Sequence, residues 1–494
     1  MKRLIYRLLT QGKHSPKRVA KALNACFSSS VEETAQTAIL GAGITGLCIA
    51  HSLHQSGQSC HVLESSLKVG GALQTTIKDE FLAEHGPNSL LVKDRRLLSL
   101  FQEIGLGGDS IDTELQDTLP EAKKRFIVHD GKVCAMPTSP IGMLRSPLFS
   151  TRGMLRIAME PFISRYRGEQ EESLAGFVTR RLGPEMLASA AGPFVSGIYA
   201  GDPATLSVRH AFPRLWKLEN KHRSLVLGAL AIRRKKRNNP HAIPRTRTVS
   251  FKSGLAALPQ ALRKTLPENT INLGCKITSI EANSTGWKLV WTDADDQQQS
   301  ANYARLVIAV PHHKLACLPL PAEILEELEP VSNIPSPPVT SLVLGFKREQ
   351  IKHKLDGFGM LIKTSEQSPL LGVLFSSSMF EGRAPDGHVT LTCMMGGVKN
   401  PQHAENDDRV VMDELRKLLG VSGNPVFRHR TSWSHAIPQY TLDYQQAVDA
   451  ADVCEHRHPG LYLAGNYRGG ISVSDCILNG LQMGKRLGTT EPDS

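Results

Sequence analysis

The chain has 494 residues, of which 40% are hydrophobic and 21% charged. This composition excludes a chain that is disordered throughout, and the length exceeds what a single hydrophobic core supports, so we expect two or three lobes. The nine cysteines are odd in number and form no C-x-x-C pair, which argues against a disulfide framework and against a metal site built on cysteine.

The first segment, residues 1–34, has the composition of an organelle transit peptide. Residues 1–31 carry seven Lys or Arg and no acidic residue, and they contribute strongly to the net charge of +11. Apolar residues recur there at helical spacing, whereas no continuous apolar run follows the charges, so a secretory signal is disfavoured. The alternative is a solvated basic tail with no role of its own.

Residues 37–64 have the pattern of a dinucleotide-binding strand, turn, helix and strand. A short apolar strand at 38–40 leads into a G-x-G-x-x-G motif, formed by Gly41, Gly43 and Gly46. These glycines permit, in order, a tight turn, the approach of a pyrophosphate, and close packing of the helix on the strand. The helix is expected to end at Gly57. Glu64 ends the second strand, where a carboxylate can accept hydrogen bonds from a ribose diol.

The sequence after Glu64 distinguishes FAD from NAD. It contains the pair Gly70-Gly71 and then Gly86-Pro87, where small or turn-forming residues let the main chain pass close to a cofactor. This continuation resembles the flavin amine-oxidase superfamily, in which both segments line the isoalloxazine end of FAD.

Between residues 139 and 230 the pattern is helical, with Pro and Gly breaks and with apolar-basic stretches that can lie on an anionic membrane surface. The alternative, which is commoner for such stretches, is a solvated helix face over a core. The longest uncharged stretch, residues 186–201, is shorter than the roughly 18 residues that a membrane span needs, so no transmembrane helix is expected. The basic run at 233–237 precedes an Asn- and Pro-containing segment and predicts an exposed loop. No aromatic residues interleave with it, so nucleic-acid binding is not expected.

Residues 460–487 are expected to complete the cofactor site. A short strand is followed by a Gly465-Asn466 turn and by a final amphipathic helix from about Ser474. The backbone N–H groups of such a turn can face the flavin and stabilise its reduced, anionic form. Asp475 suits the dipole at the start of this helix, which is a structural role. No cysteine lies at the glycine pair where monoamine oxidases, which belong to the superfamily that this chain resembles, attach FAD covalently. The resemblance therefore implies that FAD is bound non-covalently.

The FAD contacts that the resemblance implies lie on these segments and on one further residue, Ile277. They are Gly41, Ala42, Gly43, Ile44, Thr45, Gly46, Glu64, Ser65, Gly70, Gly71, Ala72, Gly86, Pro87, Asn88, Ser89, Ile277, Gly465, Asn466, Ile471, Ser472 and Val473.

Six segments resemble the protoporphyrinogen oxidase family in the same order and at similar spacing. They are KKRFIVHDGKVCAMPTSP (123–140), AGPFVSGIYAGDPATLSVRHAFPRLWKLE (191–219), GFGMLI (357–362), LLGVLFSSSMFEGRAPDGHVTLTCMMGG (370–397), WSHAIPQY (433–440) and LAGNYRGG (463–470). The resemblance runs from about residue 37 to the end of the chain and is nearest to the oxygen-dependent type of mitochondria and plastids.

This resemblance implies an α/β fold, α+β overall, with a Rossmann-like FAD-binding domain, a mixed-sheet substrate domain and an inserted helical domain that associates with a membrane surface without spanning it. The implied ranges are 35–92, 231–312 (including the basic loop) and 441–494 for the FAD-binding domain, 93–138 and 313–440 for the substrate domain, and 139–230 for the helical domain.

The implied reaction is oxidation of protoporphyrinogen IX to protoporphyrin IX by O₂, with H₂O₂ as the second product. The implied location is the mitochondrial inner membrane, with a plastid membrane as the alternative. The resemblance also allows a homodimer and the transfer of product to a ferrochelatase.

Two residues are candidates for binding the substrate, which is a flexible macrocycle with carboxylate arms. Arg125 matches the family's substrate-carboxylate arginine, and a guanidinium can hold a propionate bidentately; the alternative is an exposed strand arginine. Phe375 is a candidate aromatic wall, with ordinary core packing as the alternative. No catalytic acid or base is assigned, because the pyrrole N–H groups lose their protons by tautomerisation. The histidines that could serve as an acid or base are His312, His313 and His435. The sequence indicates no hydrogen-bonding partner for them, so a structural role is expected.

Three other functions stay open from the sequence. A coproporphyrinogen III oxidase would need further cations for a substrate with four carboxylates. An amine or carotenoid oxidoreductase could use the same scaffold. A non-catalytic flavoprotein or a prenyl-protein carrier of the GDP-dissociation-inhibitor kind is the alternative outside the enzymes, and a flavin absorbance spectrum would eliminate the carrier.

Overall fold

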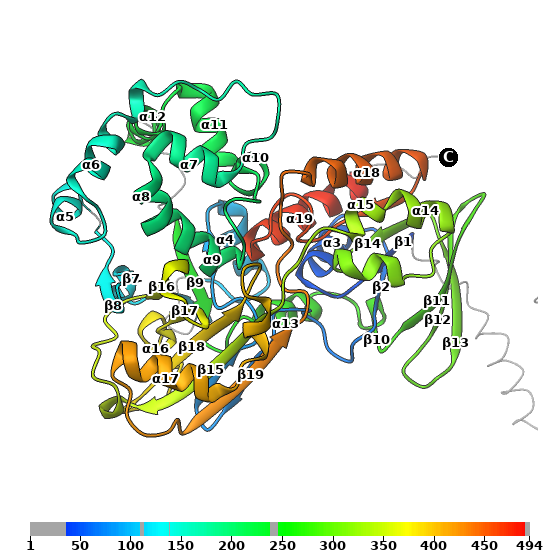
Figure 1. Cartoon of the computed structure of the whole chain (residues 1–494). Helices are drawn as coiled ribbons and strands as arrows, with labels where there is room; N and C mark the ends of the chain where they lie inside the picture. The colour runs from blue at the N-terminus through cyan, green and yellow to red at the C-terminus, as the bar shows by residue number, and fades with distance from the viewer. Residues whose placement is uncertain (1–35, 109–112, 138, 238–245, 490–494) are drawn as a thin grey trace, which may run out of the picture.

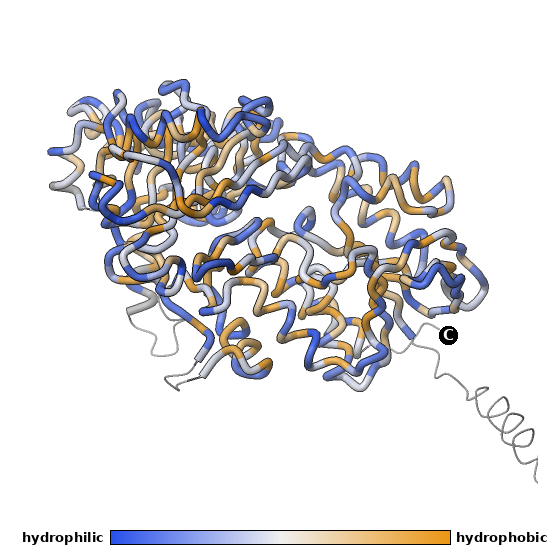
Figure 2. Tube along the Cα trace, turned by 90° about the horizontal axis from the view of Figure 1, so that it is seen from below, coloured by the Kyte–Doolittle hydropathy of each residue, from blue (hydrophilic) through white to orange (hydrophobic). Residues whose placement is uncertain are grey.

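The computed structural model describes residues 36–108, 113–137, 139–237 and 246–489 (Figure 1). The predicted transit peptide, residues 1–34, lies outside these ranges. Figure 2 shows apolar segments running through the inside of the molecule, with hydrophilic residues at many of the outer turns. None of the helices in the described ranges is long and apolar enough to cross a bilayer.

A five-stranded parallel sheet forms the centre of the first lobe, with the order β10-β2-β1-β14-β20. Its strands are β1 (Thr37–Leu40), β2 (Cys60–Glu64), β10 (Ile271–Leu273), β14 (Arg305–Ile308) and β20 (Leu461–Leu463). They come from three parts of the chain that lie far apart in sequence. Strands β1 and β14 are buried along their whole length, as expected for a parallel sheet with both faces covered.

Helices α3 (Ile44–Gln55) and α19 (Val473–Thr489) pack closely against each other beside this sheet. The approach is close because α19 carries Gly480, where an added Cβ would lie 2.7 Å from the carbonyl oxygen of Thr45. Helix α3 ends just before Gly57, which has a φ of 72° and so adopts the left-handed conformation that ends many helices.

A seven-stranded mixed sheet forms the second lobe, with the order β19-β15-β18-β17-β16-β7-β8. Its strands are β7 (Phe126–His129), β8 (Lys132–Ala135), β15 (Val339–Lys347), β16 (Gly359–Ile362), β17 (Leu370–Leu374), β18 (His388–Gly396) and β19 (Phe427–Trp433). Only the pair β7 and β16 runs parallel among the described strands of this sheet. Helix α17 (Asp408–Leu419) packs its apolar residues into the same core.

Three smaller sheets and further helices complete these lobes. The strands are β3 (Thr75–Lys78) with β4 (Phe81–Glu84), β5 (Leu90–Val92) and β6 (Leu115–Asp117) on either side of β9 (Arg247–Phe251), and β11 (Lys276–Asn283), β12 (Gly286–Thr292) and β13 (Gln298–Tyr303). The helices are α4 (Arg95–Glu103), α13 (Ala257–Lys264), α14 (Ala322–Glu327), α15 (Glu329–Ser332), α16 (Ser376–Met379) and α18 (Tyr444–Arg457).

The third lobe is helical and lies at the upper left of Figure 1. Its helices are α5 (Pro140–Arg145), α6 (Thr151–Ala158), α7 (Leu174–Leu182), α8 (Pro184–Met186), α9 (Gly192–Tyr199), α10 (Val208–Ala211), α11 (Pro213–His222) and α12 (Leu225–Arg237). The sequence prediction of a loop at 233–237 is wrong, because these residues form the last turns of α12. Arginine and lysine are good helix formers, so the run continues the helix before the Asn- and Pro-containing segment begins.

A buried ion network stabilises this helical lobe. Arg181 and Glu160 are both 0% exposed and pair at 3.2 Å, and the Nε of Arg181 also donates to Glu219 at 2.6 Å. Glu160 additionally accepts hydrogen bonds from the Ser224 hydroxyl at 2.6 Å and from the Leu225 N–H at 2.8 Å, so it caps α12. The network therefore links α7, α11 and α12 to the short 3₁₀ turn at Glu160–Phe162.

Candidate active site

The G-x-G-x-x-G motif forms the turn between β1 and α3, as predicted. Gly41 has a φ of 105°, and an added Cβ there would lie 3.1 Å from the carbonyl oxygen of Ala309 on the neighbouring chain segment. At Gly46 an added Cβ would lie 2.1 Å from the carbonyl oxygen of Gly41. Both glycines are thus required by the packing of the protein itself.

Gly43 differs from its two neighbours in the motif. Its φ of −69° is open to any residue, and an added Cβ would meet no atom of the described residues within 4 Å. Gly43 precedes the first turn of α3, where no side chain of a described residue caps the free N–H groups. Space and unpaired donors at a helix start are what a phosphate group requires, so the residues present fit the pyrophosphate of FAD.

Glu64 fixes the shape of the same turn. One carboxylate oxygen accepts a hydrogen bond from the Ala42 N–H at 2.7 Å, and the other accepts from the Ser66 N–H at 2.8 Å. These bonds tie the end of β2 to the turn after β1. The predicted contact of Glu64 with a ribose diol stays a prediction, and it uses lone pairs that these two bonds leave available.

The second glycine segment lies beside the first. The Gly70 N–H donates to the Ala42 carbonyl at 2.8 Å, and an added Cβ at Gly71 would lie 3.5 Å from the Cα of Gly43. The Gly86-Pro87 turn lies beside this second segment, since an added Cβ at Gly86 would lie 2.8 Å from the carbonyl oxygen of Ala72. The structure therefore brings together the three predicted N-terminal segments.

The C-terminal turn, residues 465–473, connects β20 to α19. Gly469 and Gly470 have φ values of 79° and 129°, which side chains rarely allow. Asp475 lies in the first turn of α19, where it accepts a hydrogen bond from Ser472 and pairs with Lys93. The pairing with Lys93 was missed from the sequence, because nothing in the local pattern around residue 93 points to residue 475.

The remaining predicted cofactor residues lie on these turns or next to them. Ile277 lies on β11, close to the point where the Cys275 N–H donates to the Glu64 carbonyl at 2.8 Å. The individual FAD contacts that the sequence predicts stay predictions.

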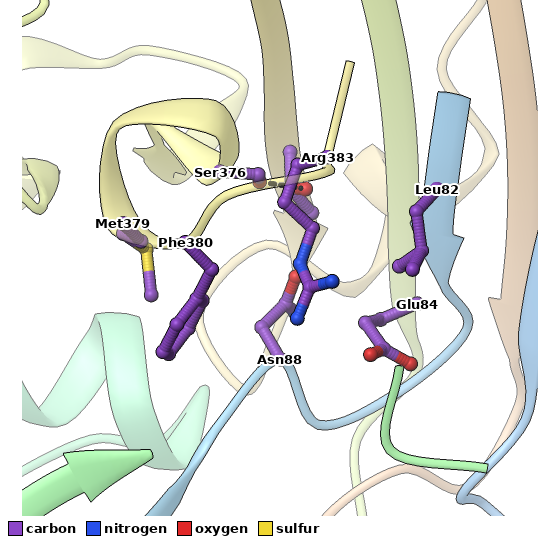
Figure 3. Close-up of a pocket in the computed structure, with 8 residues that line it drawn as sticks. Leu82, Glu84, Asn88, Ser376, Met379, Phe380 and Arg383 are labelled. Atoms are coloured by element: carbon purple, nitrogen blue, oxygen red, sulfur yellow. Dashed lines mark hydrogen bonds between the residues drawn. The ribbon is translucent and has the colours of Figure 1, made fainter. Parts of the chain in front are cut away.

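A small cavity lies where the first and second lobes meet (Figure 3). It encloses about 10 Å³, which is room for about one water molecule, and its lining residues are Leu82, Glu84, Asn88, Ser376, Met379, Phe380, Arg383 and Thr392. The Glu84 side chain accepts hydrogen bonds from the Thr75 hydroxyl at 2.7 Å and the Leu255 N–H at 2.8 Å. Burial nevertheless raises the pKa of Glu84 to about 7. The cavity is too small for a macrocycle and borders the turn at Gly86 through Asn88.

Arg125 lies at the start of β7, where the Met136 N–H donates to its carbonyl oxygen at 2.8 Å. Its side chain is exposed and its guanidinium carbon lies 4.9 Å from the ring centre of Phe358. It forms no ion pair with any residue in the described ranges. A guanidinium held over an aromatic ring without an acidic partner is available to bind an external carboxylate.

Phe375 lies at the end of β17 and is 0% exposed. Its ring centre is 6.1 Å from that of Phe126 and 5.5 Å from that of His353, within the core of the second lobe. A side chain without exposed surface is not available to a ligand, so the structure favours the packing role that the sequence left open.

The three histidines have structural surroundings. The Nε2 of His312 is 2.8 Å from the carbonyl oxygen of Ile334, and the rings of His313 and His435 stack with centres 4.4 Å apart. Burial lowers the pKa values of His312 and His313 to about 4, helped for His312 by the neighbouring His313. Both are neutral near pH 7 and are poor proton donors there.

The comparisons with known proteins identify the family of the chain. Residues 44–485 match the family described as flavin containing amine oxidoreductase. The chain is similar to protoporphyrinogen oxidase 2 of Arabidopsis thaliana, with 32% identity over 90% of this chain and 92% of the relative. It is also similar to coproporphyrinogen III oxidase of Bacillus subtilis, with 27% identity over 90% of this chain and 95% of the relative.

A solved structure of a candidate protoporphyrinogen oxidase from Exiguobacterium sp. 255-15 has the same fold, with a TM-score of 0.76 and 21% identity. It covers 92% of this chain, and this chain covers 98% of it. The predicted fold class and the flavin cofactor are thereby confirmed. The chain is an FAD-dependent oxidoreductase that belongs to the flavin-containing amine oxidoreductase family and, within it, to the protoporphyrinogen oxidases.

Proposed function

We propose that this chain oxidises protoporphyrinogen IX to protoporphyrin IX, with O₂ as the electron acceptor and H₂O₂ as the second product. Family membership supports the reaction class. The observation that carries the substrate assignment is Arg125, an exposed guanidinium without an acidic partner among the described residues, at the start of β7 in the second lobe.

The residues of the first lobe would hold FAD non-covalently. The turn at Gly43 and the start of α3 would bind the pyrophosphate, and the C-terminal turn would place its N–H groups against the ring system. The chemistry that FAD supplies when bound is acceptance of a hydride from the macrocycle and transfer of electrons to O₂. The chain's own residues then contribute orientation and electrostatics rather than proton transfer.

The substrate would lie between the second lobe and the helical lobe. Helix α9 packs on β16, the parallel neighbour of β7, and two of its large apolar side chains, Phe194 and Ile198, are exposed. Together with Phe358 they would supply apolar walls, while Arg125 would bind a propionate at the rim. A cation at the rim also holds the macrocycle in one orientation.

The Arg125→Ala variant is expected to lose roughly ten- to a hundredfold in kcat/KM for protoporphyrinogen, because a charge-assisted hydrogen bond contributes about 1.5–3 kcal/mol. Arg125→Lys is expected to recover only part of this loss, since an ammonium cannot reproduce the planar fork. FAD content and thermal stability should stay unchanged, because the side chain lies apart from the flavin segments. Steady-state kinetics with the free acid and with an ester lacking carboxylates measure the effect. An equal ratio of the two rates in wild type and variant would refute the contact.

A second candidate substrate is coproporphyrinogen III, favoured by the similarity to the Bacillus subtilis relative. That substrate carries four carboxylates and would need further cations around the cavity. Anaerobic mixing of the flavin-loaded protein with each porphyrinogen, followed by the loss of flavin absorbance, decides between them. If coproporphyrinogen III bleaches the flavin faster, it replaces protoporphyrinogen IX as the proposed substrate.

The helical lobe is proposed to rest on a lipid surface without spanning it. We define the apolar patch as Leu155, Met159, Phe162, Val226, Leu227 and Leu230, all large and exposed. The two segments that carry these residues are neighbours, because Glu160 accepts a hydrogen bond from the Val226 N–H at 3.2 Å and so joins the segment of Phe162 to the start of α12. An exposed apolar group of this kind among basic residues fits an anionic interface. We propose the mitochondrial inner membrane as the location, with a plastid membrane as the alternative.

The double variant Phe162→Glu, Leu227→Glu is expected to lose most of its binding to anionic vesicles, because each buried apolar side chain contributes roughly 1.5–3 kcal/mol. Co-sedimentation with cardiolipin-containing liposomes measures the bound fraction. The matched control is Leu67→Glu, since Leu67 is 73% exposed but lies in the first lobe, and it should bind as wild type. Equal binding by all three proteins would show that the apolar patch is not the membrane contact.

A further inference from the structure

The chain immediately before α18 lies between the helical lobe and the C-terminal turn. On the helical side, the Ser207 N–H donates to the Tyr440 carbonyl at 2.9 Å, and the Leu442 N–H donates to the Thr205 carbonyl at 3.1 Å. On the other side, the side chains of Tyr440 and Tyr444 reach the C-terminal turn. One short segment is therefore bonded to both parts of the molecule.

The hydroxyl of Tyr440 joins the two ends of the C-terminal turn. It donates a hydrogen bond to the Asn466 carbonyl at 2.7 Å and accepts one from the Gly470 N–H at 3.1 Å. The side chain is 3% exposed, so water cannot replace either bond easily. Burial raises the pKa of Tyr440 well above its ordinary value, and the hydroxyl keeps its proton as a donor.

Tyr444 adds a second point of attachment. Its hydroxyl donates to the Tyr467 carbonyl at 2.6 Å, between the two atoms that Tyr440 holds. The two tyrosine rings stack with centres 4.1 Å apart and an angle of 20° between their planes. His210 of the helical lobe lies against Tyr444 with ring centres 5.1 Å apart, so the tyrosine pair is itself held in place.

We propose that Tyr440, supported by Tyr444, is a positioning residue that fixes the C-terminal turn against the flavin and thereby sets FAD affinity and the electronic surroundings of the ring. The turn needs such support because Gly469 and Gly470 have no side chains and adopt positive φ values. Neither hydroxyl has a part in the reaction proposed above. The inference rests on the proposed flavin site, and it adds a physical link from that site to the helical lobe.

The Tyr440→Phe variant tests the proposal in the flavin-loaded protein. It keeps the ring stack and removes both bonds, which leaves the half-buried Asn466 carbonyl and the half-buried Gly470 N–H without this partner. The dissociation constant for FAD is expected to rise at least about tenfold, and the visible circular-dichroism bands of the bound flavin are expected to shift. The KM for the porphyrinogen should change little, because Arg125 is unaffected.

The matched control is Tyr199→Phe, because the Tyr199 hydroxyl also donates to a backbone carbonyl, that of Ala211 at 2.8 Å, but within the helical lobe. This control is expected to keep the wild-type FAD affinity and spectrum even where its thermal stability falls. If Tyr440→Phe does not fold, Tyr444→Phe should show a smaller change in the same direction.

Wild-type FAD affinity and an unshifted flavin spectrum in a folded Tyr440→Phe or Tyr444→Phe protein would overturn the proposal. An equal change in Tyr199→Phe would overturn it too, since the effect would then be one of general stability. Normal FAD binding by the Gly43→Val variant would instead contradict the proposed flavin site itself, and this result is distinguishable from the outcomes above.

Discussion

The Gly43→Val variant is expected to fold and to be isolated almost without FAD. Its φ of −69° suits a valine, and the space around the added Cβ is free of atoms of the described residues within 4 Å. The side chain would therefore cost the protein little, but it would occupy the volume that the pyrophosphate requires. The ratio of flavin absorbance to protein absorbance, together with the far-ultraviolet circular dichroism, measures cofactor and fold separately.

Gly46→Ala provides the contrast within the same motif. An added Cβ there would lie 2.1 Å from the backbone oxygen of Gly41, so this variant should lose thermal stability as well as FAD. The two glycines thus serve different needs, one of the ligand and one of the protein. Normal flavin occupancy in Gly43→Val would refute this account of the opening motif.

The Arg181→Met variant is expected to destabilise the helical lobe by about 3–5 kcal/mol, because it leaves the buried carboxylate of Glu160 without its cation, whereas Glu219 keeps Arg180 at 2.9 Å. Methionine has a similar length, so the change removes charge and hydrogen bonds more than volume. Urea unfolding followed by circular dichroism and by limited proteolysis within residues 139–237 would measure the loss.

The control for this charge deletion is Arg416→Met on the exposed face of α17. Arg416 pairs with Asp413 at 2.7 Å, but both side chains are largely exposed, so the pair is expected to contribute less than about 1 kcal/mol. Equal losses of unfolding free energy in Arg181→Met and Arg416→Met would show that the buried ion pair stabilises the protein no more than the exposed one.

The sequence was most informative where local geometry decides the structure. The turn from β1 to α3 follows from three glycines, since strand, turn and helix all lie within about twenty residues. Family resemblance then indicated the flavin cofactor and the fold class, which the comparisons confirm. The spacing of a few residues was therefore enough to predict the turn and the cofactor.

The sequence failed where distant residues meet. The Tyr440 hydroxyl contacts Asn466 and Gly470, and no periodicity relates these positions. Similarly, the sequence pattern is the same whether an aromatic residue at the end of a strand packs in the core or lines a pocket. The burial of Phe375 in the structure favours packing. The loop expected at 233–237 was wrong because arginine and lysine are good helix formers, so the basic run continues α12 to Arg237.

The assembly of the parallel sheet from three distant segments has a consequence for the order of folding. Strand β20 pairs with β14, and α19 packs on α3. The surroundings of the G-x-G-x-x-G turn are therefore complete only after the ribosome has added residues 461–489. The ion network that joins α7, α11 and α12 lies within residues 160–225, so these helices can associate early in synthesis. The flavin lobe must wait for pairings of high contact order. A premature stop codon before β20 would therefore yield a chain with a folded helical lobe and no competent cofactor site, and such a chain would expose the apolar flank of β14 to aggregation.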